Sequence, residues 1–328
     1  MRTVYIGTLD GAGLTVATAD PTTGALTPTG TVVDLPEPSF FAFSADRRTL
    51  YTVGERPEGS VTAVDISDPV RPAVMNTQPT GGAGPTHLSV HHDFLLTAHY
   101  TDGTVTVHPL RPDGSIGPRT GALRHEGDEP HAHQVVTDPS GRWVLAVDLG
   151  LDAVFTHRVD QRTGAITTHA RMSLPRGTGP RHLVFHPDGT RAHILGESRP
   201  VIITAGWDPT TGTLTPTNTR PVIGPHAPDP SYPAEIVINE AGEHLYASTR
   251  GEDAIAVLRA NGPSLVQSAP TGGAWPRHCV LAPGERLLYV ANQNSGTVTW
   301  LPRDPETGLL GAPAGSMAVR GACFIAFP

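Results

Sequence analysis

The stretch "GPRHLVFHPDGTRAHILGES", residues 179–198, predicts a β-hairpin. A short apolar run at 183–185 leads into Pro187-Asp188-Gly189, and a second apolar run ends at Glu197. Short apolar runs separated by Pro, Asp and Gly are typical of two strands joined by a turn. The sequence therefore predicts a strand, a turn and a second strand here.

Imperfect copies of this stretch recur along the chain. Their first prolines are separated by 47, 45, 50, 53 and 43 residues. A repeat of roughly 40–50 residues that carries several short strands is typical of β-propeller blades. The prolines that open the copies are Pro38, Pro85, Pro130, Pro180, Pro233 and Pro276.

Each copy also predicts an outer pair of strands. Alternating apolar residues at 103–110, 152–159, 253–260 and 296–303 indicate the third strand of four blades. The N-terminal residues 3–33 match a second, third and fourth strand, and residues 321–328 match a first strand, with Cys323 aligned to Cys279. We therefore expect an all-β, seven-bladed β-propeller with four-stranded antiparallel blades. One domain spans 1–328, and its last blade is completed by both ends of the chain.

Composition narrows the function classes. The net charge is -8, the chain has no lysine, and its arginines are scattered, so no basic face for nucleic acid is expected. No apolar run approaches the roughly 20 residues of a membrane span. The N-terminus lacks the pattern of a secretion signal, so a cytoplasmic location is expected. The two cysteines, Cys279 and Cys323, form neither a disulfide framework nor a CxxC zinc motif.

Two sets of positions in the blades are expected to converge. In a propeller the first strands begin, and the antiparallel second strands end, at the same mouth. The first strands begin with Ser39, Thr86, His131, Arg181, Ala234 and Arg277, followed by Phe40, His87, Ala132, His182, Glu235 and His278. The second strands end at Glu55, Tyr100, Leu149, Glu197, Arg250 and Gln293.

The uneven chemistry of these positions indicates a ligand site. Buried charges are costly unless they are paired, so a mouth rich in imidazoles, guanidiniums and carboxylates is the default site. The residues that distinguish single blades, and that we expect to be catalytic, are His133, Arg181, Glu197 and Arg250. The expected substrate-binding residues are His87, His131, His182, Glu235, Arg277 and His278. Among these, His87, His182 and His278 recur in three blades, which fits a structural role equally well.

A metal-dependent reaction is an alternative at the same mouth. His131 and His133, which alternate along a predicted strand, could form a three-histidine zinc site with His87 or His182. Neighbouring arginines repel a cation and favour an anion, so no metal and no cofactor are expected. The sequence has no GxSxG nucleophile motif, and neither cysteine lies beside an obvious base.

The motifs resemble those of the lactonase family of seven-bladed propellers, which includes bacterial 6-phosphogluconolactonases and fungal carboxymuconate cyclases. The resemblance rests on "GAGPTHLSV" (82–90), "PHAHQVV" (130–136), "GTGPRHLVFHPDG" (177–189), "STRGEDAIAV" (248–257) and "WPRHCVLAPGERLLYVANQ" (275–293). In the fungal cyclases a histidine, two arginines and a glutamate are assigned to the active site. The resemblance transfers these roles to His133, Arg181, Arg250 and Glu197.

The resemblance implies hydrolysis of a sugar lactone, with 6-phosphogluconolactone as the first candidate. Glu197 or His133 would take a proton from water, and the other would serve the leaving group. Arg181 and Arg250 would stabilise the oxyanion or hold an anionic group of the small-molecule substrate. One alternative is the formation of a lactone or ring from a muconate-like acid. Another is a non-catalytic binding propeller, because "LYVANQNSGTVTWL" (288–301) is similar to repeats of secreted and surface propellers.

Overall fold

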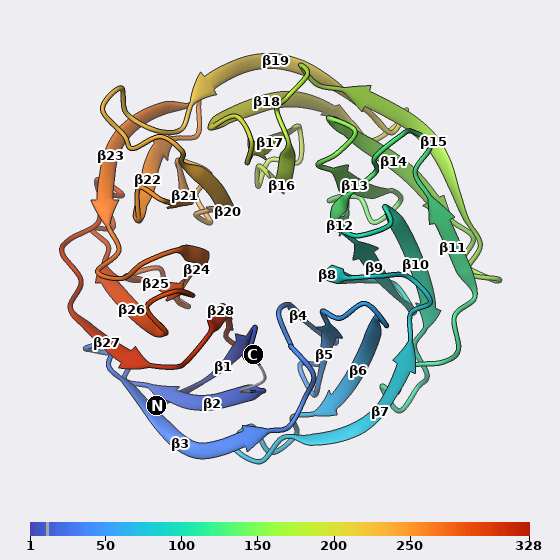
Figure 1. Cartoon of the computed structure of the whole chain (residues 1–328), viewed down its shortest axis with the longest axis horizontal. Helices are drawn as coiled ribbons and strands as arrows, with labels where there is room; N and C mark the ends of the chain where they lie inside the picture. Colours follow the sequence, from blue (N-terminus) through green and yellow to red (C-terminus); the bar gives the residue numbers. More distant parts are fainter. Residues whose placement is uncertain (11–12) are drawn as a thin grey trace. The chain divides into compact units, whose positions relative to one another are not determined.

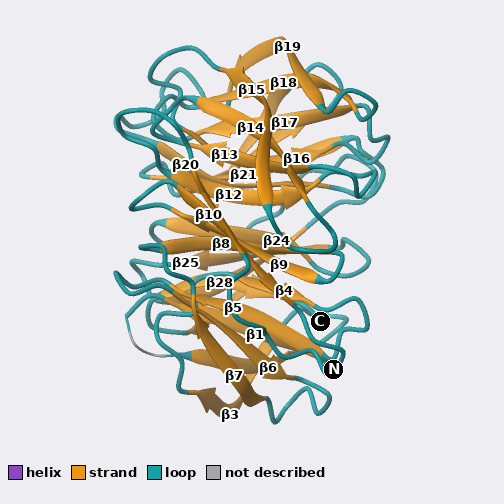
Figure 2. Ribbon diagram, turned by 90° about the vertical axis from the view of Figure 1, so that its right-hand side faces the viewer, coloured by secondary structure: helices purple, strands orange, loops and turns teal. Residues whose placement is uncertain are grey.

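The computed structural model describes residues 1–10 and 13–328. This part of the chain contains 28 strands joined by turns and loops, and no helix (Figure 2). The strands form seven sheets of four strands each (Figure 1). The all-β prediction of four-stranded blades is therefore confirmed. Residues 11–12, in the N-terminal segment expected to complete the last blade, lie outside the described residues.

The chain forms two compact units, which we call the first and the second unit. The second unit comprises residues 33–181 and 207–215 and holds three complete sheets. Their strands are β4 (Phe41–Phe43), β5 (Thr49–Gly54), β6 (Ser60–Asp65) and β7 (Ala73–Pro79); β8 (Pro85–His91), β9 (Phe94–His99), β10 (Thr104–Pro109) and β11 (Gly121–Arg124); β12 (Ala132–Thr137), β13 (Val144–Asp148), β14 (Ala153–Val159) and β15 (Ile166–Ser173).

The first unit comprises residues 1–32, 182–206 and 216–328, and holds all or most of the other four sheets. Their strands are β16 (Pro180–Phe185), β17 (Arg191–Gly196), β18 (Val201–Asp208) and β19 (Thr213–Pro221); β20 (Tyr232–Ile238), β21 (His244–Arg250), β22 (Ala254–Arg259) and β23 (Ser264–Pro270); β24 (Pro276–Leu281), β25 (Leu287–Asn292), β26 (Thr297–Pro302) and β27 (Gly315–Ala318); β28 (Ala322–Ala326), β1 (Arg2–Thr8), β2 (Leu14–Ala19) and β3 (Leu26–Val33). The expected single domain over 1–328 stays a prediction.

The two ends of the chain meet in one sheet. The C-terminal strand β28 pairs antiparallel with the N-terminal strand β1, with Ile6 opposite Ile325 (Figure 1). Because β28 covers β1, the sheet continues across the junction of the two ends. This confirms the prediction that both ends of the chain complete one blade.

The core lies in layers between successive sheets. In the second unit, Tyr51 of β5 packs with Leu88 of β8 and Leu95 of β9 in one buried cluster. In the first unit, Leu195 of β17 shares a cluster with Leu245 of β21. Burial of such aliphatic and aromatic side chains is the main favourable term in folding. Within each unit, the inner strands of neighbouring sheets are therefore held together by buried side chains.

A tyrosine links successive sheets at three equivalent places. The Tyr51 hydroxyl donates to the Gly114 carbonyl oxygen at 2.9 Å, and the Tyr289 hydroxyl donates to the Gly24 oxygen at 2.8 Å. A third bond joins Tyr246 to the Gly308 oxygen at 2.8 Å. Each tyrosine lies on the second strand of one sheet, and each acceptor lies between the third and fourth strands of the next sheet. We call these three hydrogen bonds the tyrosine links.

Each of five first strands carries a β-bulge near its start. In β8 the pairing passes from Pro85 to His87, in β12 from Ala132 to Gln134, and in β24 from Pro276 to His278. A bulge inserts one extra residue and re-aims its side chain. The skipped residues are Thr86 in β8, His133 in β12, Arg277 in β24 and Cys323 in β28; β20 has the same irregularity between Pro233 and Ile236.

This register corrects two sequence alignments. His133, not His131, is the counterpart of Thr86 and Arg277, because Ala132 takes the place of the proline in blade three. Likewise Cys323 corresponds to Arg277, so its predicted alignment with Cys279 was wrong. Both errors came from matching residue types rather than the paired backbone.

Candidate functional site

In the second unit, Tyr100 lies against both histidines of "PHAH". The ring of His131 stacks on Tyr100 with 4.6 Å between centroids, and His133 meets the same ring edge-on at 5.8 Å. His131 Nδ1 donates to the Tyr100 carbonyl oxygen at 2.7 Å, which requires the proton on that nitrogen. The two predicted residues therefore contact the same aromatic ring, and His133 is only 5 % exposed.

A buried Asp–His pair fixes the backbone of this histidine loop. Asp148 Oδ1 accepts the backbone N–H of His131 at 2.9 Å, and its Oδ2 lies 2.6 Å from His125 Nδ1. The next contact joins His125 to His157 at 3.2 Å, and burial lowers the pKa of His157 to about 3. Sequence reasoning missed His125, because it lies in the loop before the blade-three repeat.

His87 and Thr86 connect β8 to β12 within the second unit. Thr86 Oγ1 donates to the His133 carbonyl oxygen at 3.2 Å. The backbone N–H of Val135 is directed at His87 Nδ1 at 3.5 Å, and the ring of Phe40 lies 3.9 Å from that of His87. His87, on the first strand β8, thus contacts both the first strand β12 and Phe40, which lies just before the first strand β4. Arg181, in the motif "GPRH" at the start of β16, is 3 % exposed.

In the first unit, Glu197 and Arg250 form an ion pair. Arg250 Nη2 lies 2.9 Å from Glu197 Oε2, with side-chain exposures of 7 % and 23 % respectively. Glu197 directly follows β17, and Arg250 is the last residue of β21. Two of the four predicted catalytic residues are therefore in direct contact.

Further contacts hold the guanidinium of Arg250. Its Nε donates to the Tyr232 carbonyl oxygen at 3.1 Å, and its Nη2 approaches the Pro233 oxygen at 3.4 Å. The Arg250 Cζ also lies over the Trp275 ring, 5.4 Å from its centroid. Tyr232 and Trp275 were not among the predicted site residues. The sequence feature that could have identified Trp275 was its position directly before the "PRH" motif.

Three predicted binding residues meet in a buried network of the first unit. Glu235 Oε1 lies 3.0 Å from His182 Nδ1, and Glu235 Oε2 lies 3.4 Å from His278 Nε2. The Ile325 N–H is directed at His278 Nδ1, so the proton of that ring belongs on Nε2 and points at Glu235. One carboxylate therefore joins the first strands β16, β20 and β24. Arg277, the bulge residue of β24, is half-buried.

The comparisons with known proteins decide the family. A family model described as "Lactonase, 7-bladed beta-propeller" matches residues 3–327. The chain belongs to this family. It is therefore a seven-bladed β-propeller and a lactone hydrolase, as expected from the sequence.

Individual relatives agree with this assignment. The lactonase is 32 % identical over 291 residues to the 6-phosphogluconolactonase of Bacillus subtilis, covering 84 % of this chain and 83 % of the relative. A solved periplasmic gluconolactonase of Pseudomonas aeruginosa is similar over 99 % of this chain and 98 % of its own, at 27 % identity and a TM-score of 0.94. A putative 6-phosphogluconolactonase of Bacteroides fragilis is 26 % identical, with a TM-score of 0.92, covering 100 % and 98 % of the two chains.

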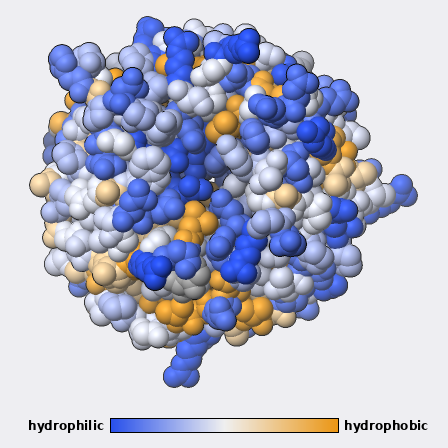
Figure 3. Space-filling model, viewed as in Figure 1, coloured by the Kyte–Doolittle hydropathy of each residue, from blue (hydrophilic) through white to orange (hydrophobic). Residues whose placement is uncertain are grey.

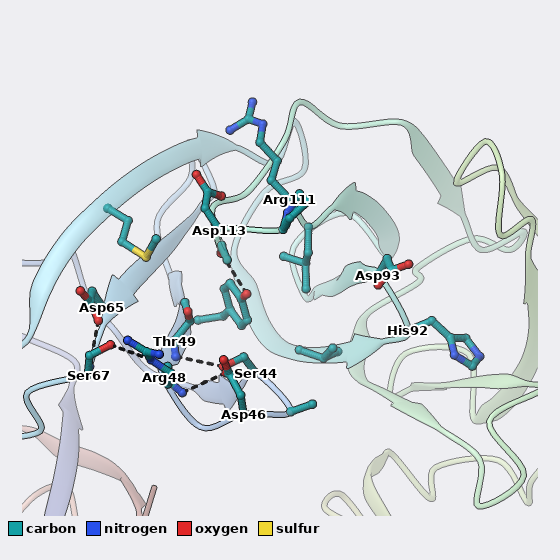
Figure 4. Close-up of a pocket in the computed structure, with 17 residues that line it drawn as sticks. Ser44, Asp46, Arg48, Thr49, Asp65, Ser67, His92, Asp93, Arg111 and Asp113 are labelled. Atoms are coloured by element: carbon teal, nitrogen blue, oxygen red, sulfur yellow. Dashed lines mark hydrogen bonds between the residues drawn. The ribbon is translucent and has the colours of Figure 1, made fainter.

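The lactonase also has a cavity away from these residues. Four loops of the second unit line a space of about 780 Å³, which includes Arg48, His92 and Arg111 but none of the ten predicted site residues (Figure 4). Some charged side chains of this cavity form hydrogen bonds with neighbouring residues; for example, Arg48 Nε donates to Ser67 Oγ at 3.1 Å. The face of the lactonase seen in Figure 3 is mainly hydrophilic, with small apolar groups between.

The described residues contain neither a metal-binding cluster nor a membrane-spanning helix. Across residues 1–10 and 13–328, no group of three or more His, Cys, Asp or Glu side chains is arranged to hold a metal ion. Within the same residues, no helix has the length and apolar character needed to cross a membrane. Cys279 and Cys323 are both buried, neither is part of a disulfide, and burial raises the pKa of the Cys279 thiol.

Proposed function

We propose that this lactonase hydrolyses 6-phosphogluconolactone to 6-phosphogluconate without a metal or another cofactor. The observation that carries the proposal is the contact between Glu197 and Arg250, which joins a partly exposed carboxylate to a buried cation. The name of the Bacillus subtilis relative supports the phosphorylated sugar lactone as substrate. Arginine is the side chain best suited to a phosphate, since its planar fork matches two oxygens.

We propose Glu197 as the general base. A base must reach water, and the Glu197 side chain is 23 % exposed whereas His133 is 5 % exposed as a residue. The carboxylate removes a proton from water as the water oxygen bonds to the lactone carbonyl carbon. The tetrahedral intermediate then breaks its ring C–O bond, and the ring oxygen takes a proton. Acid–base help of this kind contributes about 10²–10⁴-fold in rate.

His133 is our candidate for the proton donor to the ring oxygen. An imidazole changes its charge near neutral pH, which suits proton delivery to an alkoxide. The edge-on contact with Tyr100 limits the orientations of the His133 ring. The reverse assignment, with His133 as base, predicts that substitution of His133 lowers the rate more than substitution of Glu197.

Arg181 and Arg250 supply positive charge. In our proposal Arg181, buried at the start of β16, stabilises the oxyanion, and Arg250 holds the anionic group of the substrate. Preorganised donors directed at a developing oxyanion are worth about 10²–10³-fold in kcat. The strands β16 and β17, which precede and follow the turn of the "GPRH" hairpin, are neighbours in one sheet, which supports a shared role for Arg181 and Glu197.

The test measures the hydrolysis of a panel of substrates, with proton release as the readout, in the presence and absence of EDTA. The panel contains phosphorylated sugar lactones, plain sugar lactones and muconates. We expect turnover of the phosphorylated lactone that persists in EDTA and drops at least about 100-fold in Glu197→Gln and in Arg181→Ala. Full activity in both variants refutes the residue assignment. Activity on muconates alone favours the cyclising reaction, and ligand binding with no turnover favours a non-catalytic propeller.

We further propose a cytoplasmic location. A phosphorylated sugar lactone is an anion, and charged groups cross the bilayer core only at high cost, so this substrate stays where it is made. The periplasmic gluconolactonase of Pseudomonas aeruginosa shows that a protein of similar fold works elsewhere. Cell fractionation with a phosphorylated-lactone assay tests the location.

A further inference from the structure

Trp275 occupies a backbone conformation that disfavours tryptophan. Its φ is +64°, in the left-handed region where side chains with a Cβ are strained. Its carbonyl oxygen accepts the N–H of Gln293 at 3.0 Å, and its own N–H donates to Asp253 Oδ1 at 2.8 Å. The chain therefore holds a large aromatic residue in a conformation suited to glycine.

Glycine occupies the same position in three other blades. Gly84 and Gly321 directly precede the first strands β8 and β28, with φ of +61° and +65°. Their carbonyl oxygens accept the N–H of Tyr100 and Leu9, as that of Trp275 accepts the N–H of Gln293. Gly179, before β16, has φ of +54°. The fold is thus well served by glycine here, so the indole of Trp275 has a reason other than blade architecture.

The surroundings of the indole supply that reason. The guanidinium carbon of Arg250 lies over the Trp275 ring at 5.4 Å, within the range of a cation–π contact. Tyr232, whose carbonyl oxygen accepts from Arg250 Nε, has its ring 6.2 Å from that of Trp275. Glu197 binds the same guanidinium at 2.9 Å. Trp275 is therefore one of the groups that orient Arg250.

We propose that Trp275 is a positioning residue for Arg250 and thereby sets the preference for anionic over neutral lactones. The proposal rests on the proposed function, because it assigns Arg250 to the anionic group of the substrate. A guanidinium held between an aromatic face, a carboxylate and two carbonyl oxygens loses little freedom when the anion binds. Preorganisation of this kind increases affinity by lowering the cost of ordering the site.

Three substitutions separate the ring from the backbone. Trp275→Phe keeps an aromatic face, Trp275→Leu keeps an apolar side chain, and Trp275→Gly removes the backbone strain. We expect Leu and Gly to lower kcat/KM for 6-phosphogluconolactone about 2- to 30-fold, mainly through KM, the range that a cation–π contact supports. Glucono-δ-lactone should be hydrolysed within about twofold of the wild-type rate, and Phe should retain most of the preference.

Stability distinguishes this role from simple packing. Because glycine relieves the left-handed strain, Trp275→Gly should unfold at a temperature equal to or above that of the wild type. The matched control is Glu37→Gly, since Glu37 has φ of +46° before the first strand β4 and its oxygen accepts the N–H of Glu55. This control should leave both kinetic constants unchanged. Equal losses on both lactones, or a lowered unfolding temperature with no change in substrate preference, would overturn the proposal.

A fluorescence titration tests the proposal without turnover. The other three tryptophans, Trp143, Trp207 and Trp300, are buried, whereas Trp275 is half-buried. Added 6-phosphogluconate or inorganic phosphate should change the emission of the wild type but not that of Trp275→Phe. An identical response in both proteins would contradict a role of Trp275 at Arg250. If phosphorylated lactones are not hydrolysed but the fluorescence change is retained, only the proposed function is refuted.

Discussion

His99 makes the stability of the second unit sensitive to acid. The residue is fully buried at the end of β9, and its Nδ1 donates to the Thr104 carbonyl oxygen at 3.0 Å. Its Nε2 is buried and has no hydrogen-bond partner among the described residues. A second proton would therefore create a buried cation without an acceptor. Burial accordingly lowers the pKa of His99 to about 4.

The sign and size of the effect follow from this pKa. The unfolded chain takes up the proton near the ordinary pKa of 6.5, and the folded chain only near 4. The folded state is therefore favoured above pH 6.5, and this contribution is lost as the pH falls from about 6.5 to 4. The difference corresponds to about 3 kcal/mol, a large part of the typical stability of a domain.

A single substitution isolates this contribution. At the equivalent end of two other second strands, Thr8 and Thr249 donate through Oγ1 to carbonyl oxygens five residues on, as His99 does to Thr104. We expect the His99→Thr variant to keep this hydrogen bond. Between pH 7 and pH 4, its unfolding free energy should fall by about 3 kcal/mol less than that of the wild type.

The assay is urea unfolding followed by circular dichroism at pH values from 7 to 4. The comparison uses the change in unfolding free energy with pH, since the smaller side chain lowers stability at every pH. The exposed His226, changed to Gln, is the control and should leave the pH dependence unaltered. Parallel curves for His99→Thr and the wild type would refute the reasoning.

Two other predictions concern stability and thiol chemistry. Tyr289→Phe, which removes the hydroxyl that donates to the Gly24 oxygen, should cost about 1 kcal/mol in unfolding free energy. A change below the error of the unfolding curve would show that the tyrosine link contributes little. Cys279 and Cys323 are buried, so a thiol reagent should react slowly with the native protein and label both thiols after denaturation. Rapid labelling of the native protein, or fewer than two thiols after denaturation without a reductant, would contradict this.

The blades were predictable because each one repeats local signals. The alternating run at 296–303 predicted a third strand, and β26 occupies Thr297–Pro302. The match of residues 321–328 to a first strand predicted β28 beside β1. Turn residues and alternating apolar residues act over a few positions, so a single sequence displays them directly.

The contacts around the candidate site were only partly predictable. The "STRG" motif singled out Arg250, but Trp275 lies in the next blade, so the contact between the two could not be seen in the sequence. The alignment of His131 failed because the proline before blade three precedes the strand, whereas the pairing begins at Ala132. Contacts such as Asp148 with His125 depend on side-chain directions between distant segments, and these follow from register rather than from residue type.

The bulge at the start of the first strands also bears on how such an enzyme can change its substrate. A residue left out of the ladder is replaced without disturbing the hydrogen bonds on either side of it. Thr86, His133, Arg277 and Cys323 differ widely in size and charge at this one position. A small library confined to the half-buried bulge residue Arg277, which lies outside the proposed catalytic set, would therefore explore new specificities while leaving the strand pairing intact, so evolvability is built into the backbone itself.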